Sequence, residues 1–251
     1  MSSPSRRKFL GAGVAVGGTA GLAVAAKLAA RYGLIPPDWS GVYGPGETLT
    51  YATQRILTAG HSMAREFTRA EISKVAQVSG DPPRRDSYRR HQDTGFKDWR
   101  LSIDGLIARP ASFSLAELKT FPSRSQITEQ TCEEGWSFIA EWSGVPLSYL
   151  MNLVGVLPQA KYVVFFPFDE SWDSLDMADA LHAQTLIAYR MNGEDLPPEH
   201  GAPARVKVPR QLGYKSVKYL SQIMLVDTLK DVGSGRGSAA PDFGYSWYAG
   251  I

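Results

Sequence analysis

The chain has 251 residues, of which 43% are hydrophobic and 21% are charged, an ordinary globular composition. Its formal net charge of +2 gives no overall indication of nucleic-acid binding, so only local clusters of basic residues call for interpretation. With 24 Gly and 16 Pro, the composition disfavours a helical bundle and favours a loop-rich fold with many short strands.

The N-terminus carries a twin-arginine pattern, Ser5-Arg6-Arg7-Lys8-Phe9-Leu10, followed by an apolar stretch from Gly11 to Ala26. This combination predicts a Tat signal peptide over residues 1–30 and a periplasmic protein. The apolar stretch is nearly as long as the roughly 20 residues that a helix needs to span a bilayer, so an uncleaved membrane anchor is the alternative. Because the Tat route exports folded proteins, often around a cofactor, the leader favours a cofactor enzyme.

Residues 31–94 are interpreted as an N-terminal wrap and linker, with one helix from Tyr51 to about Ala64. Residues 95–230 are expected to form the core. Alternating or continuous apolar runs there predict five strands. These strands are Trp99–Ile103, Ser125–Thr131, Tyr162–Phe166, Arg205–Val208 and Val217–Val226.

Helices are expected between these strands. Ser114 and Glu117 form a capping box that opens a short helix to about Thr120. The other helical segments are Val145–Leu153, with Pro146 in its first turn, and Met177–Leu181. The run Leu186–Arg190 either extends the last helix or forms a strand. Residues 231–251 are expected to be a C-terminal tail, in which a flexible Gly/Ser linker, 233–238, precedes an aromatic end, 243–248.

Cys132 is the only cysteine, and in an exported protein an unpaired thiol suggests an intermolecular bond, a reactive nucleophile or a soft metal ligand. A zinc or iron–sulfur site needs several Cys or His at short spacing, but the four His are scattered. Any metal on Cys132 must therefore take its other ligands from outside the protein, such as an organic cofactor. A buried structural thiol and a Cys/His hydrolase remain the alternatives.

A basic stretch runs from His200 to Lys218. In a strand, Arg205 and Lys207 share one face while Val206 and Val208 pack inward. Ser216 and Lys218 recur on one face after a glycine. Cationic side chains and backbone N–H groups arranged in this way suit a phosphate or pyrophosphate. The alternative is an ordinary solvated strand face.

These two segments carry a resemblance. Cys132-Glu133-Glu134-Gly135-Trp136-Ser137, followed by Trp142-Ser143-Gly144-Val145-Pro146-Leu147, resembles the active-site segment of the sulfite oxidase family of molybdenum enzymes. Residues 190–205 and 213–218 are similar to its pterin-binding region. The branch that the chain resembles most is the Tat-exported, haem-free one that includes periplasmic methionine-sulfoxide reductases.

The resemblance implies a mixed-sheet α+β molybdopterin-binding domain of the sulfite oxidase type, with molybdenum–molybdopterin as cofactor. Carried over by position, Cys132 is the thiolate ligand of molybdenum. The residues implied to bind the cofactor are Arg65, His200, Arg205, Lys215, Ser216, Val217 and Lys218. Pro167 stands where the sulfoxide-reductase branch has a pterin-contacting Thr, so Ser171 or Ser174 is expected to replace that contact.

The resemblance implies an oxidoreductase that transfers an oxygen atom to or from a small substrate. Reduction of a sulfoxide or of an S/N-oxide is the first interpretation, with electrons from a membrane b-type or soluble c-type cytochrome. Sulfite-type oxidation is the alternative, because sulfite oxidases carry His at the position of His200, where the reductases carry Asn. A non-catalytic molybdopterin-fold binding protein is the alternative from another class. Without a dimerisation domain after the second motif, the chain is expected to be a monomer.

Overall fold

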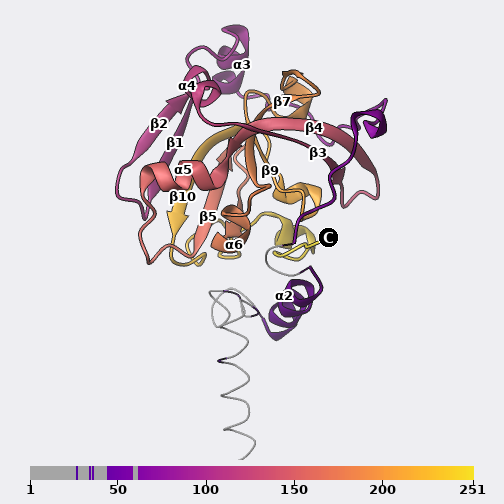
Figure 1. Ribbon diagram of the computed structural model, residues 1–251. Helices are drawn as coiled ribbons and strands as arrows, with labels where there is room; N and C mark the ends of the chain where they lie inside the picture. The colour runs from indigo at the N-terminus through magenta and orange to yellow at the C-terminus, as the bar shows by residue number, and fades with distance from the viewer. Residues whose placement is uncertain (1–26, 28–33, 35, 37–43, 59–61) are drawn as a thin grey trace, which may run out of the picture.

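The computed structural model describes residues 44–58 and 62–251, together with Lys27, Leu34 and Pro36. The body of the molecule is built on two β-sheets with short helices around them (Figure 1). The strands are β1 (Arg100–Gly105), β2 (Ala111–Ser114), β3 (Arg124–Thr131), β4 (Ser137–Pro146), β5 (Tyr162–Pro167), β6 (Asp173–Asp176), β7 (Leu186–Met191), β8 (Glu194–Asp195), β9 (Arg205–Lys207) and β10 (Leu220–Val226). The helices are α2 (Pro45–Thr58), α3 (Asp86–Asp93), α4 (Leu115–Thr120), α5 (Leu147–Val154) and α6 (Met177–Ala180), with short 3₁₀ turns η1 (Arg69–Glu71), η2 (Pro198–His200), η3 (Gly213–Lys215) and η4 (Ala240–Phe243).

The two sheets differ in strand direction. The first has the order β2-β1-β10-β5-β6, in which β1 and β10 are parallel and the other neighbours antiparallel. The second has the order β3-β4-β7-β8, with β9 paired to β7, and is antiparallel throughout. This arrangement confirms the expected mixed-sheet α+β fold.

The main hydrophobic core draws on both sheets. Leu101 and Ile103 of β1 point inward because successive side chains of a strand alternate between its faces. Val206 of β9 joins the same core from the second sheet. Helix α5 covers it with Leu147, Leu150, Met151 and Val154, whose spacing places them on one helix face.

Most expected elements are present, with shifted bounds. Strand β4 pairs with β7 as far as Pro146, so α5 begins at Leu147, two residues later than expected, and Pro146 is its N-cap rather than part of its first turn. The run Leu186–Arg190 is a strand, because it lies between β4 and β9 and satisfies its backbone groups there. Strand β10 begins only at Leu220, after Tyr219 adopts a positive φ of 55°. The capping box at Ser114 is confirmed.

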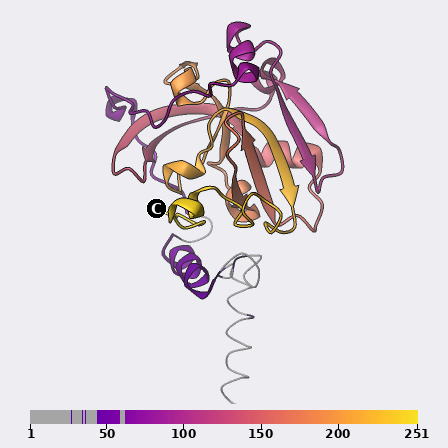
Figure 2. The same cartoon turned by 180° about the vertical axis from the view of Figure 1, so that it is seen from behind.

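Helix α2 and the C-terminal tail lie against each other below the sheets (Figures 1 and 2). The rings of Tyr51 and Tyr248 are in edge contact at 4.9 Å, and the Gly250 amide donates to Gln54 Oε1. Helix α2 begins earlier than expected, and residues 59–61 of the expected helix lie outside the described residues. In the segment predicted to be a flexible linker, Gly237 and Ser238 are buried, whereas Gly233, Ser234 and Arg236 are exposed.

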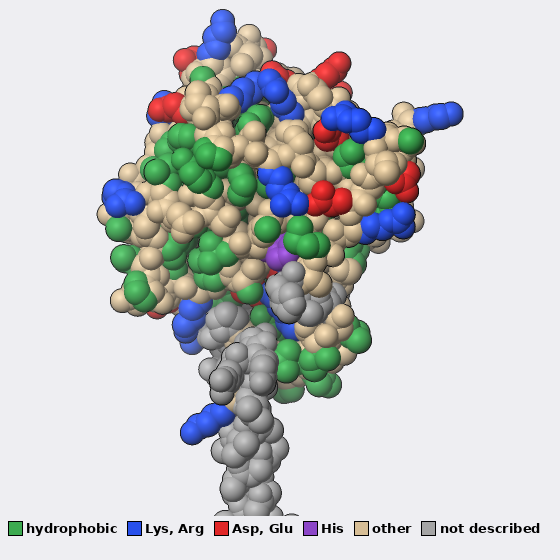
Figure 3. Space-filling model, viewed as in Figure 1, with side chains coloured by type: hydrophobic (Ala, Val, Ile, Leu, Met, Phe, Trp, Pro, Cys, Tyr) green, Lys and Arg blue, Asp and Glu red, His purple; other side chains and the backbone are tan. Residues whose placement is uncertain are grey.

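The expected signal segment, residues 1–30, lies outside the described residues apart from Lys27. Within the part of the chain that is described, no helix combines the length and apolar character required to cross a bilayer. On the face shown in Figure 3, acidic and basic side chains are interspersed over the surface. The cationic side chains that matter for the site are the buried ones described next.

Candidate functional site

Cys132 lies in a tight connection between β3 and β4. Its amide donates to Trp136 O at 2.9 Å, and its own carbonyl accepts from the Gly135 amide at 3.1 Å. Gly135 has a φ of +89°, a conformation that glycine adopts without strain. On the other side, a Cβ at Gly213 would come within 2.8 Å of Gln130 Nε2 and 3.5 Å of Cys132 Cα. The η3 turn therefore approaches the cysteine loop closely, and a larger residue at Gly213 would require the end of the Gln130 side chain to move.

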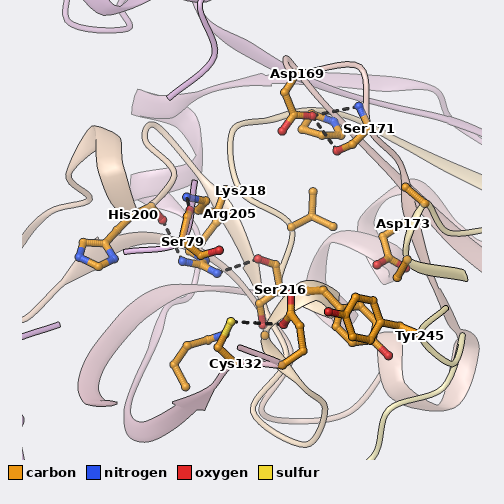
Figure 4. Close-up of a pocket in the computed structure, with 18 of the residues that line it drawn as sticks. Ser79, Cys132, Asp169, Ser171, Asp173, His200, Arg205, Ser216, Lys218 and Tyr245 are labelled. Carbon is orange, nitrogen blue, oxygen red and sulfur yellow. Dashed lines mark hydrogen bonds between the residues drawn. The ribbon is translucent and has the colours of Figure 1, made fainter. Parts of the chain in front are cut away.

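The Cys132 thiol faces a cavity of about 310 Å³ and is only 6% exposed (Figure 4). Burial raises the pKa of the thiol to about 11, and the neighbouring Glu133 carboxylate, which accepts a hydrogen bond from Sγ at 3.3 Å, contributes to this increase. A catalytic nucleophile of a cysteine hydrolase instead needs a lowered pKa. The environment thus disfavours the hydrolase alternative, whereas a bound metal ion would displace the proton directly.

Arg205 lies on β9 beside the same cavity and is 5% exposed. Its Nη1 donates to His200 O at 2.9 Å and its Nη2 to Ser216 O at 2.7 Å, while its guanidinium stands 5.1 Å from the centre of the Trp142 ring. Burial lowers the pKa of Arg205 to about 10. Among the described residues, no carboxylate forms an ion pair with Arg205, and its guanidinium donates only to carbonyl oxygens. Its positive charge can therefore attract an anion.

Lys218 and Ser216 line the cavity next to Arg205. Lys218 Nζ donates to Ser79 O at 2.6 Å and to Glu199 O at 3.1 Å, again carbonyl oxygens. Burial and then the charge of Arg205 lower the pKa of Lys218 to about 8, so the amine is still protonated at neutral pH. Ser216 Oγ accepts from the Val208 amide at 3.0 Å, which leaves its own O–H free to donate into the cavity.

His200 also lines the cavity, at the end of η2. Its ring packs edge-on against Phe138 with 5.8 Å between centroids. Burial, followed by the charges of Arg205 and Lys218, lowers the pKa of His200 to about 4. The imidazole is therefore neutral at pH 7 and can donate or accept one hydrogen bond without adding charge.

The other expected site residues are the remaining cofactor-binding residues, Val217, Lys215 and Arg65, and a second group around the missing Thr contact, Pro167, Ser171 and Ser174. Val217 lines the cavity, whereas Lys215 does not and forms a buried ion pair with Asp173, which does. Arg65 is not brought to the cavity: its side chain is 73% exposed and forms an ion pair with Glu71. In the second group, both Pro167 and Ser171 line the cavity.

Ser174 does not reach the cavity, because its hydroxyl is bonded to Gly237 O and to Trp247 Nε1. Of the two serines expected to replace the missing Thr contact, Ser171 is therefore the one in position. Its hydroxyl donates to Asp169 Oδ1 at 2.6 Å and can still accept a hydrogen bond.

Sequence reasoning missed several parts of the cavity. Gln77 and Ser79 come from the segment interpreted as a linker, and Phe243 and Tyr245 come from the tail. Nothing in the local pattern distinguishes the first pair from ordinary loop residues. The aromatic content of the tail was noted, but its position at the cavity depends on packing against β5 and β6, which is a long-range contact.

The donor set suits an anionic cofactor that carries a thiophilic metal. Lys207 is buried but does not line the cavity, and its Nζ donates to Glu129 O and to Gln130 Oε1. Burial lowers the pKa of Lys207 well below its ordinary value, so its charge is not counted toward the site. Arg205 and Lys218 meet at the cavity wall near Cys132 (Figure 4). Among the described residues, no group of three His, Cys, Asp or Glu side chains could hold a metal ion. A soft metal at Cys132 would therefore take its remaining ligands from the cofactor.

The fold and the lining of the cavity fit a domain that holds an anionic metal cofactor. Residues 89–232, more than half of the chain, match the family described as oxidoreductase molybdopterin binding domain. The chain belongs to this family. Its cofactor is accordingly molybdenum–molybdopterin, as the resemblance predicted.

Curated relatives share part of the sequence. The chain is 38% identical over 152 residues to a putative protein-methionine-sulfoxide reductase subunit, YedZ1, of Azospira oryzae, covering 61% of this chain and 56% of that protein. It is 28% identical over 207 residues to the catalytic subunit MsrP of a protein-methionine-sulfoxide reductase of Xanthomonas axonopodis pv. citri, covering 74% and 64%. The chain thus spans between about half and two thirds of the length of such relatives.

A solved structure is similar as well. The sulfane dehydrogenase SoxCD of Paracoccus pantotrophus is 29% identical, with a TM-score of 0.51 over 53% of this chain and 39% of that one. Its likeness supports the sulfite oxidase-type fold.

Proposed function

We propose that the chain catalyses the reduction of an organic sulfoxide to the sulfide. The reaction consumes two electrons and two protons, and the sulfoxide oxygen leaves as water. The observation that carries this proposal is the single buried thiol of Cys132 in a cavity whose cations, Arg205 and Lys218, have no carboxylate partners among the described residues.

The residues of the cavity have distinct roles. Cys132 binds the metal through its sulfur. Arg205, Lys218 and the Ser216 hydroxyl bind the anionic pterin phosphate, and Val217 packs beside it. When bound, the cofactor supplies a redox-active metal that can accept an oxygen atom from the substrate. Since Lys218 stays protonated at neutral pH and Arg205 always carries its charge there, both preserve the positive potential that retains an anion.

The relatives support the sulfoxide direction, because two of them are named as protein-methionine-sulfoxide reductase subunits. A second candidate is oxidation of a sulfur oxyanion. Two observations favour it: the neutral His200 at a position where sulfite oxidases carry His, and the sulfane dehydrogenase among the similar structures. Both candidates use the same cofactor and the same cysteine.

Localisation and partners belong to the same proposal. The twin-arginine pattern supports export to the periplasm, with the leader either cleaved or kept as an anchor. The electrons come from a separate redox protein, a membrane b-type or a soluble c-type cytochrome. The chain acts as a monomer, and light scattering on the purified protein would contradict this if it gave the mass of a stable dimer.

The decisive experiment is molybdenum analysis of the exported protein beside Cys132→Ser. Wild type should hold about one molybdenum per chain, and the variant should lose the metal or change its electron paramagnetic resonance signal. Ser125→Ala, a surface serine on β3, is the control. Reduced-dye oxidation by sulfoxides and sulfite-dependent dye reduction are then compared. Sulfite turnover without sulfoxide turnover would overturn the first candidate in favour of the second. Bound cofactor with neither activity would support a binding protein.

A further inference from the structure

The C-terminal tail forms one wall of the cavity. Ala239, Ala240, Phe243 and Tyr245 line it, although the family match ends at residue 232. Figure 4 shows Tyr245 across the cavity from Cys132 and Arg205. Trp172 and Tyr214 line the cavity beside the tail. We call Trp172, Tyr214, Phe243 and Tyr245 the aromatic wall.

The backbone that carries the aromatic wall is fixed on both sides of Phe243. Before it, the Ala239 amide donates to Trp172 O at 3.0 Å, and the 3₁₀ turn η4 follows directly. After it, Tyr214 donates its hydroxyl to Ser246 O at 2.6 Å and stacks on the Tyr245 ring at 5.7 Å. The segment is therefore an integral part of the cavity.

Phe243 is the most exposed member of this wall, with 80% of its surface accessible, and Tyr245 is 44% exposed. Aromatic side chains gather this much exposed apolar surface at a cavity mouth mainly where a ligand covers it. The η4 turn fixes the point at which the Phe243 side chain leaves the backbone, and the side chain lines the cavity. The exposed ring is thus available to a molecule that enters the cavity.

The opposite side of the cavity is polar and cationic, with Arg205 and Lys218. Since the proposed function assigns these cations to the phosphate of the cofactor, the aromatic wall is the part of the lining left for the substrate, and it favours a substrate that carries hydrocarbon. An organic sulfoxide has this character, whereas an inorganic oxyanion offers nothing to the aromatic wall. Sulfur also makes favourable contacts with aromatic rings.

We propose that the aromatic wall, through Phe243 in particular, binds the hydrocarbon substituent of an organic sulfoxide and selects for sulfoxides with a larger apolar group. This inference rests on the proposed sulfoxide reduction. Phe243 acts as a specificity-determining residue that contacts the non-reacting part of the substrate. Its contribution is therefore expected in KM, because such a contact is made equally in the ground state and the transition state.

The test uses the molybdenum-loaded enzyme with a reduced dye as electron donor. Steady-state kinetics are measured with dimethyl sulfoxide and with methyl phenyl sulfoxide for wild type, Phe243→Ala and Phe243→Leu. We expect Phe243→Ala to raise KM for methyl phenyl sulfoxide about tenfold, with dimethyl sulfoxide changed less than about twofold and kcat preserved. Phe243→Leu should lie between the two. Leu153→Ala, a change at another exposed apolar residue that does not line the cavity, is the control.

The outcomes separate the two proposals. If the loaded wild type turns over neither sulfoxide, the proposed function fails. If it turns over both and the ratio of their KM values is the same in Phe243→Ala, the aromatic wall does not select the substrate and this inference is overturned. Circular dichroism and molybdenum content of each variant exclude misfolding as the cause of a changed KM. An equal loss of kcat for both sulfoxides would also contradict the inference, because it would indicate damage to the reacting centre.

Discussion

His182 makes the stability of the protein sensitive to acid. The residue follows α6 and is only 8% exposed, and its Nδ1 accepts the Gln184 amide at 3.2 Å. An imidazole that accepts a hydrogen bond at Nδ1 is neutral, and protonation there would place two N–H groups against each other. Burial, and next the charge of Arg210, lower its pKa from 6.5 to about 4.

The sign follows from the two pKa values. The unfolded chain takes up a proton near pH 6.5 and the folded protein only near pH 4, so folding is progressively disfavoured as the pH falls between these values. This contribution is fully present above pH 6.5 and is lost as the pH falls through about 4. The whole difference corresponds to about 3 kcal/mol, of which about 2.5 kcal/mol is lost by about pH 4.5.

His182→Asn removes the titration while keeping an acceptor, because Asn Oδ1 can stand near the position of Nδ1. At pH 7.5 the variant should lose about 1–2 kcal/mol for the smaller buried side chain. Between about pH 7.5 and pH 4.5 the wild type should lose about 2.5 kcal/mol more than the variant. His200, whose pKa is shifted in the same direction, contributes to both profiles and cancels in the difference.

The assay is urea unfolding of the cofactor-free protein at four values of pH, followed by circular dichroism. His91→Asn, on α3, separates the effect of this site from that of removing any histidine. If the free energies of unfolding of wild type and His182→Asn run parallel within about 0.5 kcal/mol across this range, the reasoning is refuted.

Two further predictions concern the cavity and helix α2. Arg205→Gln should weaken retention of the cofactor about 10- to 100-fold, because a buried charge-assisted contact contributes about 1.5–3 kcal/mol. The amount of cofactor released on dialysis measures this effect. Arg100→Gln, a change at an exposed arginine, is the control. Equal retention in the two variants would contradict the role of Arg205. Arg55→Met should lower the free energy of unfolding by about 3–5 kcal/mol, or detach α2, because it leaves Asp176 and Asp179 buried without this partner. Urea unfolding would detect the first result, and limited proteolysis after α2 would detect the second. An unchanged unfolding midpoint and cleavage pattern would show that these ion pairs contribute little.

The local sequence was sufficient to predict a feature where few residue types can supply the chemistry or where the spacing has one common structural meaning. The lone Cys132 with its glycine and tryptophan neighbours predicted the proposed metal ligand. The basic run from Arg205 to Lys218 predicted the cationic side of the cavity. The capping box at Ser114 and the apolar strand Tyr162–Phe166 were likewise readable from spacing alone. These features depend on contacts between residues close in the chain, or on chemistry that few side chains can supply.

The sequence by itself determined the family, the fold class and the cationic side of the cavity. The tertiary structure determined which residues form the side of the cavity that faces these cations. Leu186–Arg190 became a strand because β4 and β9 flank it, and Arg65 remained at the surface paired with Glu71. The tail became a cavity wall because Trp172 and Ser174 hold it from more than 60 residues away in the chain. Such contacts join segments that are far apart in the sequence, and the local pattern of one segment does not indicate its partner. The position of Phe243 at the site therefore became visible only in the folded chain.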